Sequence, residues 1–309
     1  ECLEGFLGEE PLGIRTELVE NDLLVGNRIL GRCIFIQLAH VGRKASTWAP
    51  WLGRHGSVPL AAGGWTPVAP SPIAFDPEHA LPEVLDETAI EAIIEAFVRA
   101  AERALAAGFK VVEVHAAHGY LLHQFLSPLS NQRQDDYGGS FDNRIRLLLQ
   151  VCAAVRAVWP QELPLLVRLS ATDWVEDGWN PDETVALARH LKTLGVDLVD
   201  VSSGGTAAQA DIPLGPGYQT PFAERVRREA GIAAGTVGLI TEPAQAEHIL
   251  RTGQADLILL ARELLRDPYW PLHAGEALND RTVPWPAPYV RAARRDTPIR
   301  NLTEQPRKE

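Results

Sequence analysis

The sequence predicts an α/β fold in which helical crossovers connect the strands of a parallel sheet. After the first forty residues, short apolar runs alternate with longer amphipathic stretches, the pattern of strands and helices in βαβ units. The chain has 309 residues, of which 46% are hydrophobic, so it can bury a sizeable core. Because neither an internal repeat nor a linker divides the chain, we expect a single domain over residues 1–309.

The first strand is predicted at Ile34–Leu38, where the run IFIQL is mostly apolar. A loop rich in proline, glycine and tryptophan follows, up to about Pro82. Thr88 and Glu91 have the spacing of a capping box, which predicts the start of a helix. Its apolar residues recur at helical spacing, and Gly108 lies where the helix is expected to end.

Five more strands and five more helices alternate along the rest of the chain. The strands are predicted at Val111–His115, Leu165–Leu169, Leu198–Val201, Thr236–Leu239 and Leu257–Ala261. The helices are predicted at Asn143–Val158, Asp182–Leu194, Phe222–Glu229 and Glu242–Arg251, with Thr241 as a cap, and a short one begins near Arg262. Six strand–helix units are therefore recognisable, whereas a closed barrel needs eight.

The first 33 residues depart from this alternation. They do not have the pattern of two further strands, and Asn21–Arg32 looks like a broken helix. We therefore predict an atypical N-terminal segment over residues 1–33, and a polar tail over residues 292–309. The chain begins with Glu1 and contains no methionine, so we expect that a leader was removed or that the sequence is a fragment.

Charge and cysteine content exclude several classes of function. The formal net charge of −11 leaves no cationic excess for a nucleic-acid backbone, so we expect no nucleic-acid partner. The longest apolar runs are far shorter than the roughly 20 residues that cross a membrane, so we expect no membrane partner. The three cysteines are widely spaced and form no CxxC pair, which argues against a metal centre and fits a reducing cytoplasm.

Polar residues fall at the carboxyl end of every predicted strand. In a parallel barrel these ends share one face, and functional groups gather there. The residues in question are Gln37, His40, His115, Arg168, Ser202–Gly205, Gly238 and Arg262. Packing alone hardly explains such residues at six strand ends in series, so we expect them to surround one site.

The segment EVHAAHGY is the most informative of these. His115 and His118 follow a strand three residues apart, so both can donate to a carbonyl or phenolate oxygen and polarise it. Tyr120 can supply a proton to a developing carbanion. Two histidines with purely structural hydrogen bonds are the alternative interpretation. A metal pair is a further one, but it lacks a third ligand and helical spacing, so we expect no metal.

Two other groups of residues point to an anionic, electron-rich cofactor. Arg168 interrupts an apolar strand and needs an anionic partner, which the pyrimidine edge of a reduced flavin provides, and Gln37 can bind the same edge. Gly238, Ala261 and Arg262 follow two consecutive strands, where barrels often hold a phosphate. An ion pair of Arg262 with a neighbouring acid is the alternative.

These motifs resemble those of the old yellow enzyme family, in particular its xenobiotic-reductase-like or "thermophilic-like" branch. The resemblance runs from about residue 12 to residue 291, and the HxxHGY block with its NxRxDxYGGS continuation is its most specific part. The matching segments are Ile36–Ser46, Val68–Ile73, Ala106–Leu148, Leu165–Trp174, Asp197–Gly205, Val237–Thr241 and Ala255–Pro271.

The resemblance implies a (β/α)8 TIM-type barrel with noncovalent FMN and with NADPH or NADH as co-substrate. Hydride would pass from NAD(P)H through flavin N5 to the β-carbon of an activated alkene, such as an enone or a nitro compound. By position, His115 and His118 match the carbonyl-binding pair and Tyr120 the proton donor. Flavin contacts are implied for Gln37, Arg168, Gly238, Ala261 and Arg262. Arg291 resembles an arginine that reaches a neighbouring subunit, which implies a homo-oligomer.

The family's first strand, with its flavin contacts and a redox-tuning cysteine, has no counterpart here, and neither has its second strand. We therefore expect a chain truncated at the N-terminus, with its first two barrel strands missing or replaced. Two other classes of function remain open at this stage: a phosphate-binding barrel isomerase or lyase with His115 as base, and a non-catalytic barrel fragment. A larger dienoyl reductase with an iron–sulfur cluster is disfavoured by the absence of clustered cysteines.

Overall fold

The computed structural model describes residues 35–280, 283 and 285–292, together with the backbone of three short N-terminal strands. Six parallel strands form the middle of one sheet and pair in the order of the sequence. They are β4 (Phe35–His40), β7 (Val111–Ala116), β8 (Leu165–Ser170), β9 (Leu198–Ser202), β10 (Ala233–Thr236) and β11 (Leu257–Ile258). The predicted alternation of strands and helices is thereby confirmed.

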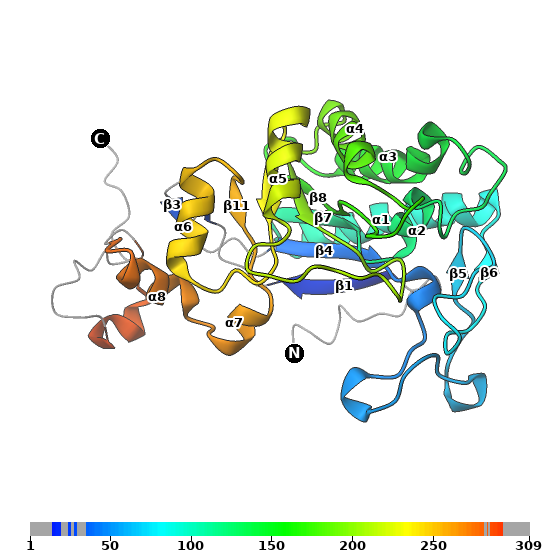
Figure 1. The fold of residues 1–309 in the computed structure, drawn as a ribbon, viewed down its shortest axis with the longest axis horizontal. Coiled ribbons are helices and arrows are strands. Elements are labelled where there is room, and N and C mark those ends of the chain that lie inside the picture. The colour runs from blue at the N-terminus through cyan, green and yellow to red at the C-terminus, as the bar shows by residue number, and fades with distance from the viewer. Residues whose placement is uncertain are drawn as a thin grey trace.

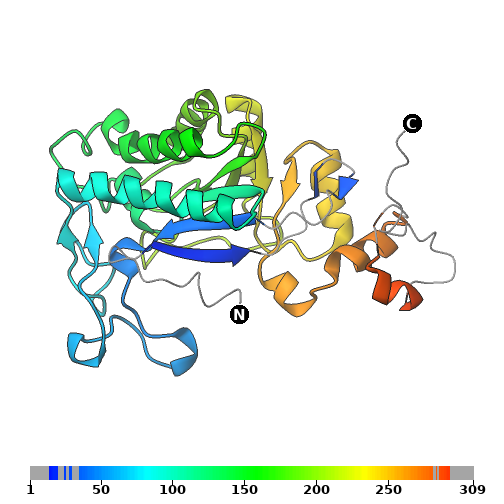
Figure 2. The same cartoon turned by 180° about the vertical axis from the view of Figure 1, so that it is seen from behind.

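Helices connect these strands, and α1, α3 and α4 lie together along one face of the sheet (Figures 1 and 2). The longer helices are α1 (Glu87–Ala106), α3 (Phe141–Val158), α4 (Pro181–Thr193), α6 (Pro243–Arg251) and α8 (Trp270–Ala277). The shorter ones are α2 (Leu121–Leu126), α5 (Thr220–Arg225), α7 (Arg262–Arg266), the π-helical turn η4 (Val226–Ala230) and the 3₁₀ helix η5 (Ala287–Ala292). No helix of the described residues is long and apolar enough to span a bilayer.

The two edges of the sheet are formed by N-terminal strands. At one edge β1 (Ile14–Val19) pairs antiparallel with β4, and at the other the hairpin of β2 (Leu24–Val25) and β3 (Arg28–Ile29) pairs with β11. The expected broken helix over Asn21–Arg32 is therefore wrong. The sheet explains the difference, because the outer edge of β11 offers backbone hydrogen bonds that an isolated segment lacks. The rest of the predicted segment 1–33, and residues 293–309 of the predicted tail, lie outside the described residues.

Two helices have N-cap residues other than those predicted. Helix α1 is capped by Asp86, whose carboxylate accepts the N–H of Ala89, and not by Thr88. Glu242, rather than Thr241, occupies the N-cap of α6 and makes no side-chain cap. Both helices begin near the predicted residue, and in α1 the acidic Asp86, two positions before Thr88, caps the first turn.

Other predicted boundaries differ from the observed ones, because these strands and helices begin or end at other residues than the sequence indicated. Strand β10 stops at Thr236, so Gly238 lies in the following loop, and β11 has only two residues. Helix α3 starts at Phe141, since Ser140 caps it by accepting the N–H of Asn143. The predicted helix Phe222–Glu229 begins earlier, in α5, and continues through the π turn η4 to Ala230.

The strands bury side chains on both faces. Residues that point toward the helices join the main core, whose largest fully buried members include Trp159, Trp179, Phe97 and Phe125. On the opposite face an apolar layer is formed by Phe35, Val111, Leu166, Leu198, Val237, Leu257 and Leu259. Because side chains alternate along a strand, the next residues of that face, two positions on, form a second layer nearer the carboxyl ends.

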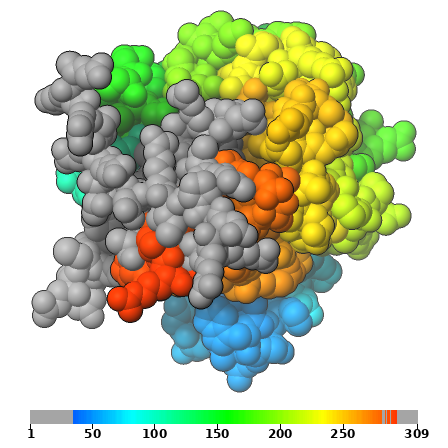
Figure 3. All heavy atoms as spheres, turned by 90° about the vertical axis from the view of Figure 1, so that its left-hand side faces the viewer, coloured from blue at the N-terminus to red at the C-terminus, as the bar shows by residue number. Residues whose placement is uncertain are grey.

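The segment between β4 and α1 projects from the body of the molecule, and Figure 3 shows its blue part below the rest. It contains the 3₁₀ turns η1 (Gly42–Lys44), η2 (Pro50–Leu52) and η3 (Leu60–Ala62) and the small sheet of β5 (Val68–Ala69) and β6 (Glu83–Val84). Trp51 at its tip is 85% exposed. The start of this segment, η1, lies at the carboxyl end of β4 and contacts the site described next.

Candidate active site

Four polar side chains from four neighbouring strands form a layer just above the apolar interior layer. Gln37 on β4 lies opposite Glu113 on β7, and its amide donates to Glu113 Oε1 at 2.5 Å. Arg168 on β8 lies opposite Asp200 on β9, with 2.9 Å between Arg168 Nε and Asp200 Oδ2. Gln37, Glu113 and Asp200 are buried, whereas 21% of the Arg168 side chain is exposed. Arg168 is therefore the most exposed member of this layer.

The two carboxyl groups of this layer share one cation. The pKa of Glu113 is raised to about 8, first by burial and then by Asp200, against the lowering effect of Arg168 and Gln37. Burial also raises the pKa of Asp200, although Arg168 opposes it. Burial therefore opposes the ionisation of both acids, and the single guanidinium of Arg168 favours it in each.

The predicted catalytic residues come together above this layer. The ring centroids of His115 and His118 are 5.1 Å apart, and the rings are nearly perpendicular. The ring of Tyr120 lies 4.7 Å from that of His115. His115 also lies opposite Arg168 in the pairing of β7 with β8, so the histidines stand next to the guanidinium. The structure thus brings four of the predicted residues to one place.

Both histidines lie in surroundings that oppose a positive charge. Burial lowers the pKa of His115 to about 3, with a further contribution from Arg168. The pKa of His118 is lowered well below its ordinary value by burial, then by Arg168 and His115. The N–H of Ala117 donates to His115 Nδ1 at 3.2 Å, so the proton of that ring is on Nε2. His115 is thereby a neutral donor, and Nε2 of His118 contacts Ser202 Oγ at 2.7 Å.

Sequence reasoning missed several groups of this site. Lys44 donates from Nζ to the carbonyl oxygens of His118 and Gly205, at 3.0 and 2.5 Å. Burial, followed by the effect of Arg43, lowers the pKa of Lys44 to about 8. Glu113 and Asp200 were missed too, although each interrupts an apolar strand as Arg168 does. The same argument applied to VVEVHA and LVDVS would have found them.

The predicted phosphate residues follow the two strands at the far side of the parallel sheet. Gly238 has a φ of +123°, and a Cβ there would meet Gln219 and Tyr218 at 2.8 Å, so glycine is needed. Ala261 is the N-cap residue of α7, and Arg262, its first residue, is exposed. The described residues include no acid paired with Arg262, whereas Arg266 of the same helix pairs with Glu263.

Arg291 lies in η5 and is exposed. No hydrogen bond or ion pair among the described residues joins it to the histidines. Its predicted role in a neighbouring subunit stays a prediction. The prediction that no metal is bound also stays one, and within the described residues no group of three or more His, Cys, Asp or Glu side chains could hold a metal ion.

The described residues fit the two ends of FMN. Arg168 is a partly exposed cation among buried groups, as the electron-rich edge of the ring requires. Gly238 and Arg262 offer a close backbone approach and a cation without an acidic partner in the described part of the chain, as a phosphate requires.

Comparison with known proteins agrees with this chemistry. Residues 30–281 match the NADH:flavin oxidoreductase / NADH oxidase family. An NADPH dehydrogenase of Geobacillus sp. (strain WCH70) is 49% identical over 249 residues, which are 81% of this chain and 68% of that protein. An NADPH dehydrogenase of Bacillus licheniformis is 48% identical over 292 residues, which are 94% of this chain and 80% of that protein.

Solved structures share the fold. A 2-naphthoyl-CoA reductase in complex with 2-naphthoyl-CoA superposes with a TM-score of 0.68 and 28% identity, over 77% of this chain but only 37% of that one. The old yellow enzyme homologue of Zymomonas mobilis superposes with a TM-score of 0.61 and 27% identity, over 78% of this chain and 66% of that one. The α/β barrel expected from the sequence is thereby confirmed.

Proposed function

The chain belongs to the NADH:flavin oxidoreductase / NADH oxidase family, and we propose that it reduces activated alkenes, with FMN as its cofactor and NAD(P)H as its reductant. When bound, FMN supplies the hydride chemistry, taking a hydride from NAD(P)H and passing it to the β-carbon of the alkene. The names of the relatives support NADPH as the reductant. The observation that carries the proposal is the cluster of His115, His118 and Tyr120 beside Arg168.

The two histidines bind the oxygen atom that activates the alkene. His115 presents Nε2–H, because its Nδ1 accepts the N–H of Ala117. We assign the hydroxyl proton of Ser202 to Nε2 of His118, 2.7 Å away, rather than to Gln219 Oε1 at 3.3 Å, which leaves the ring proton of His118 on Nδ1 to donate toward the substrate. Neutral donors suit this task, since they stabilise the negative charge that builds on the oxygen and do not give up a proton to it.

Tyr120 supplies the proton that completes the reduction. Its ring packs 4.7 Å from that of His115, and this proximity to the oxygen-binding histidine supports the role. As the β-carbon gains the hydride, the electron pair of the double bond moves to the α-carbon and the activating group. The α-carbon then takes the phenolic proton of Tyr120, which solvent restores. Hydride and proton together saturate the alkene, so the atoms and charges balance.

Cofactor contacts are assigned to the residues predicted from the sequence. Arg168 and Gln37 hold the pyrimidine edge of the flavin, while Gly238, Ala261 and Arg262 hold the phosphate. A charged donor at each end gives noncovalent binding a fixed orientation. Arg291 is proposed to reach the site of a second copy in a homo-oligomer. The three widely spaced cysteines fit a reducing cytoplasm, which we propose as the location.

Single histidine variants test this proposal. Removing one donor to a developing oxyanion typically slows a reaction about 10²–10³-fold. We expect His115→Ala and His118→Ala to slow the reduction of 2-cyclohexenone by that factor and to weaken binding of phenols, with FMN still bound. His248→Ala on the exposed face of α6 is the control and should behave like the parent. Unchanged enone reduction in both site variants would contradict the proposal.

A further inference from the structure

The turn at His118 and Gly119, between the catalytic side chains, has an unfavourable backbone conformation. His118 has a φ of 56° and Gly119 a φ of 70°, both in the left-handed region. Glycine adopts this region freely, whereas a histidine is rarely found there. Contacts outside the turn are therefore needed to hold His118 in place. The directions of His118 and Tyr120 depend on the two peptide groups that flank Gly119 between them.

Two consecutive residues of α2 bind the two peptide groups on either side of the Cα of Gly119. The N–H of Gly119 donates to Nδ1 of His123 at 2.9 Å, and the carbonyl of Gly119 accepts from Nε2 of Gln124 at 2.7 Å. Both side chains are completely buried. Gln124 also accepts the N–H of Arg43 at 3.3 Å, so the start of the projecting segment is tied to the same turn.

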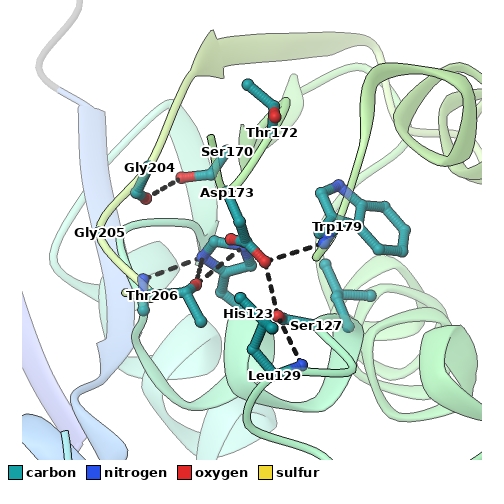
Figure 4. A network of polar contacts seen from close by, with 12 residues as sticks. His123, Ser127, Leu129, Ser170, Thr172, Asp173, Trp179, Gly204, Gly205 and Thr206 are labelled. Atoms are coloured by element: carbon teal, nitrogen blue, oxygen red, sulfur yellow. Dashed lines mark hydrogen bonds and ion pairs between the residues drawn. The ribbon is translucent and has the colours of Figure 1, made fainter. Parts of the chain in front are cut away.

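An acidic residue behind His123 fixes the orientation of its ring. Nε2 of His123 lies 3.1 Å from Oδ1 of Asp173, whose other oxygen accepts from Ser127 Oγ at 2.6 Å and from the N–H of Trp179 at 2.9 Å (Figure 4). Because Nδ1 accepts from Gly119, the proton of the ring is on Nε2 and points to Asp173. Thr206 Oγ1 also lies 3.0 Å from Nδ1. The network thus joins α2 to the loops after β8 and β9.

Asp173 is suited to this task by its charge. Burial favours its neutral form, but His123 and the donated hydrogen bonds outweigh burial and hold the pKa of Asp173 below its ordinary value. A carboxylate accepts from all its neighbours at once, whereas an amide would place an N–H against another donor.

We propose that His123 and Gln124 form a clamp on the two peptide groups that flank Gly119, with Asp173 orienting His123, and that this clamp positions His118 and Tyr120 for the reaction. These are positioning residues, since they act through the turn. The role rests on the proposed function of His118 and Tyr120. The clamp itself concerns only the two peptide groups that flank Gly119, so it can be tested without turnover.

Amide hydrogen exchange is the primary test, read by NMR or by mass spectrometry with residue resolution in the FMN-loaded protein. His123→Phe keeps a ring but removes the acceptor, so exchange of the Gly119 amide should become at least tenfold faster. Thr184→Val is the matched control, since buried Thr184 bonds to Trp179 Nε1 at 2.7 Å on the far side of Asp173 from the turn. It should lower the thermal stability and leave the exchange of Gly119 unchanged.

Two further variants keep the test decisive if His123→Phe does not fold. Gln124→Leu releases the carbonyl side of the clamp and should also speed exchange of Gly119. His123→Asn offers an amide oxygen near the position of Nδ1, so it should protect Gly119 better than Gln124→Leu does. Exchange at the parent's rate in every folded His123 and Gln124 variant, or an equal rise in Thr184→Val, would overturn the clamp.

Phenol binding tests whether the clamp affects the oxygen-binding site. It also distinguishes the positioning role of the clamp from the proposed oxygen-binding role of His118. The dissociation constant of 4-nitrophenol, followed by flavin absorbance, should rise at least tenfold in His123→Phe or Gln124→Leu and stay unchanged in Thr184→Val. If His118→Ala weakens phenol binding but the clamp variants do not, the positioning role is wrong. If His118→Ala has no effect either, the proposed oxygen-binding role is wrong, and the exchange data alone decide the clamp.

Discussion

Asp200 lies directly opposite Arg168 in the pairing of β8 with β9, and 2.9 Å separates its Oδ2 from Nε of the arginine. Asp200 is completely buried, whereas the guanidinium is partly exposed toward the ends of the strands. A buried carboxylate therefore anchors the cation that is assigned to the pyrimidine edge of the flavin. The anchor also cancels part of the positive charge that the flavin experiences.

Neutralising the anchor should make the bound flavin easier to reduce. Asp200→Asn removes one negative charge beside Arg168, and the extra positive field favours the reduced, negatively charged ring. We expect the midpoint potential to rise by about 30 mV or more, equivalent to about 1.4 kcal/mol for a two-electron couple. Arg227 and Asp256 form an ion pair of the same length elsewhere, so Asp256→Asn is the control. Equal potentials in parent and Asp200→Asn would contradict the assignment of Arg168.

Glu113 predicts a pH dependence of stability. Its pKa is raised to about 8 in the folded chain, from an ordinary value of 4.5. Between these pH values the folded chain binds more protons than the unfolded chain, so the free energy of unfolding falls as the pH rises from about 4.5 to about 8. A tenfold change in the protonation equilibrium corresponds to about 1.4 kcal/mol. Glu113→Gln, which mimics the protonated acid, should lessen this decline by a few kcal/mol.

Urea unfolding of both proteins at pH 5 and at pH 8 measures this effect. We expect Glu113→Gln to gain stability relative to the parent at the higher pH. A parent and a variant with the same loss of stability between the two pH values would show that Glu113 is ionised throughout.

The apolar strands and the EVHAAHGY segment made most of the site predictable. Arg168 could be assigned to a ligand-facing position because a charge in an apolar strand needs a partner. The actual partner, Asp200, lies 32 positions later, and only the register of β8 with β9 brings the two together. The role of His123 could not be predicted from the sequence either. It lies within the apolar run LLHQFL, and its partners Asp173 and Thr206 come from the loops after β8 and β9.

The edges of the sheet were the least predictable part of the fold. Strands β2 and β3 have two residues each, too few for a period-2 pattern to appear in the sequence. Their strand conformation depends on pairing with β11, which is distant in the chain. Helix starts were predictable to within a few residues, because several neighbouring residues, such as Asp86 and Thr88, were able to serve as caps.

Arg262 should contribute to FMN retention through a charged hydrogen bond to the phosphate. Arg262→Ala is expected to weaken FMN binding by about 1.5–3 kcal/mol. Arg266→Ala is the matched control, because Arg266 is on the same short helix but pairs with Glu263. Fluorescence titration of the apoprotein with FMN measures both affinities. Equal affinities in the two variants would remove Arg262 from the phosphate site.

The affinity of the site for phenols should not change with pH through protonation of His115 or His118. The pKa of His115 is lowered to about 3 and that of His118 well below its ordinary value, so neither ring gains a proton near pH 6.5. For a phenol whose own pKa lies above 9, the dissociation constant should be constant between pH 5 and pH 7.5. Flavin absorbance titrations over this range provide the measurement. A break near pH 6.5, where an ordinary histidine titrates, would contradict neutral donors in the site.

Tyr120→Phe tests the assigned chemistry most directly, since it keeps the ring and removes only the proton. Stopped-flow absorbance of the flavin separates the two half-reactions. We expect reduction by NADPH to proceed at the parent's rate and reoxidation by 2-cyclohexenone to slow by about 10²-fold, the usual contribution of a general acid. Reoxidation by molecular oxygen, which needs no such donor, should be unchanged. Equal slowing of NADPH and alkene steps, or slowing of neither, would contradict Tyr120 as the proton donor.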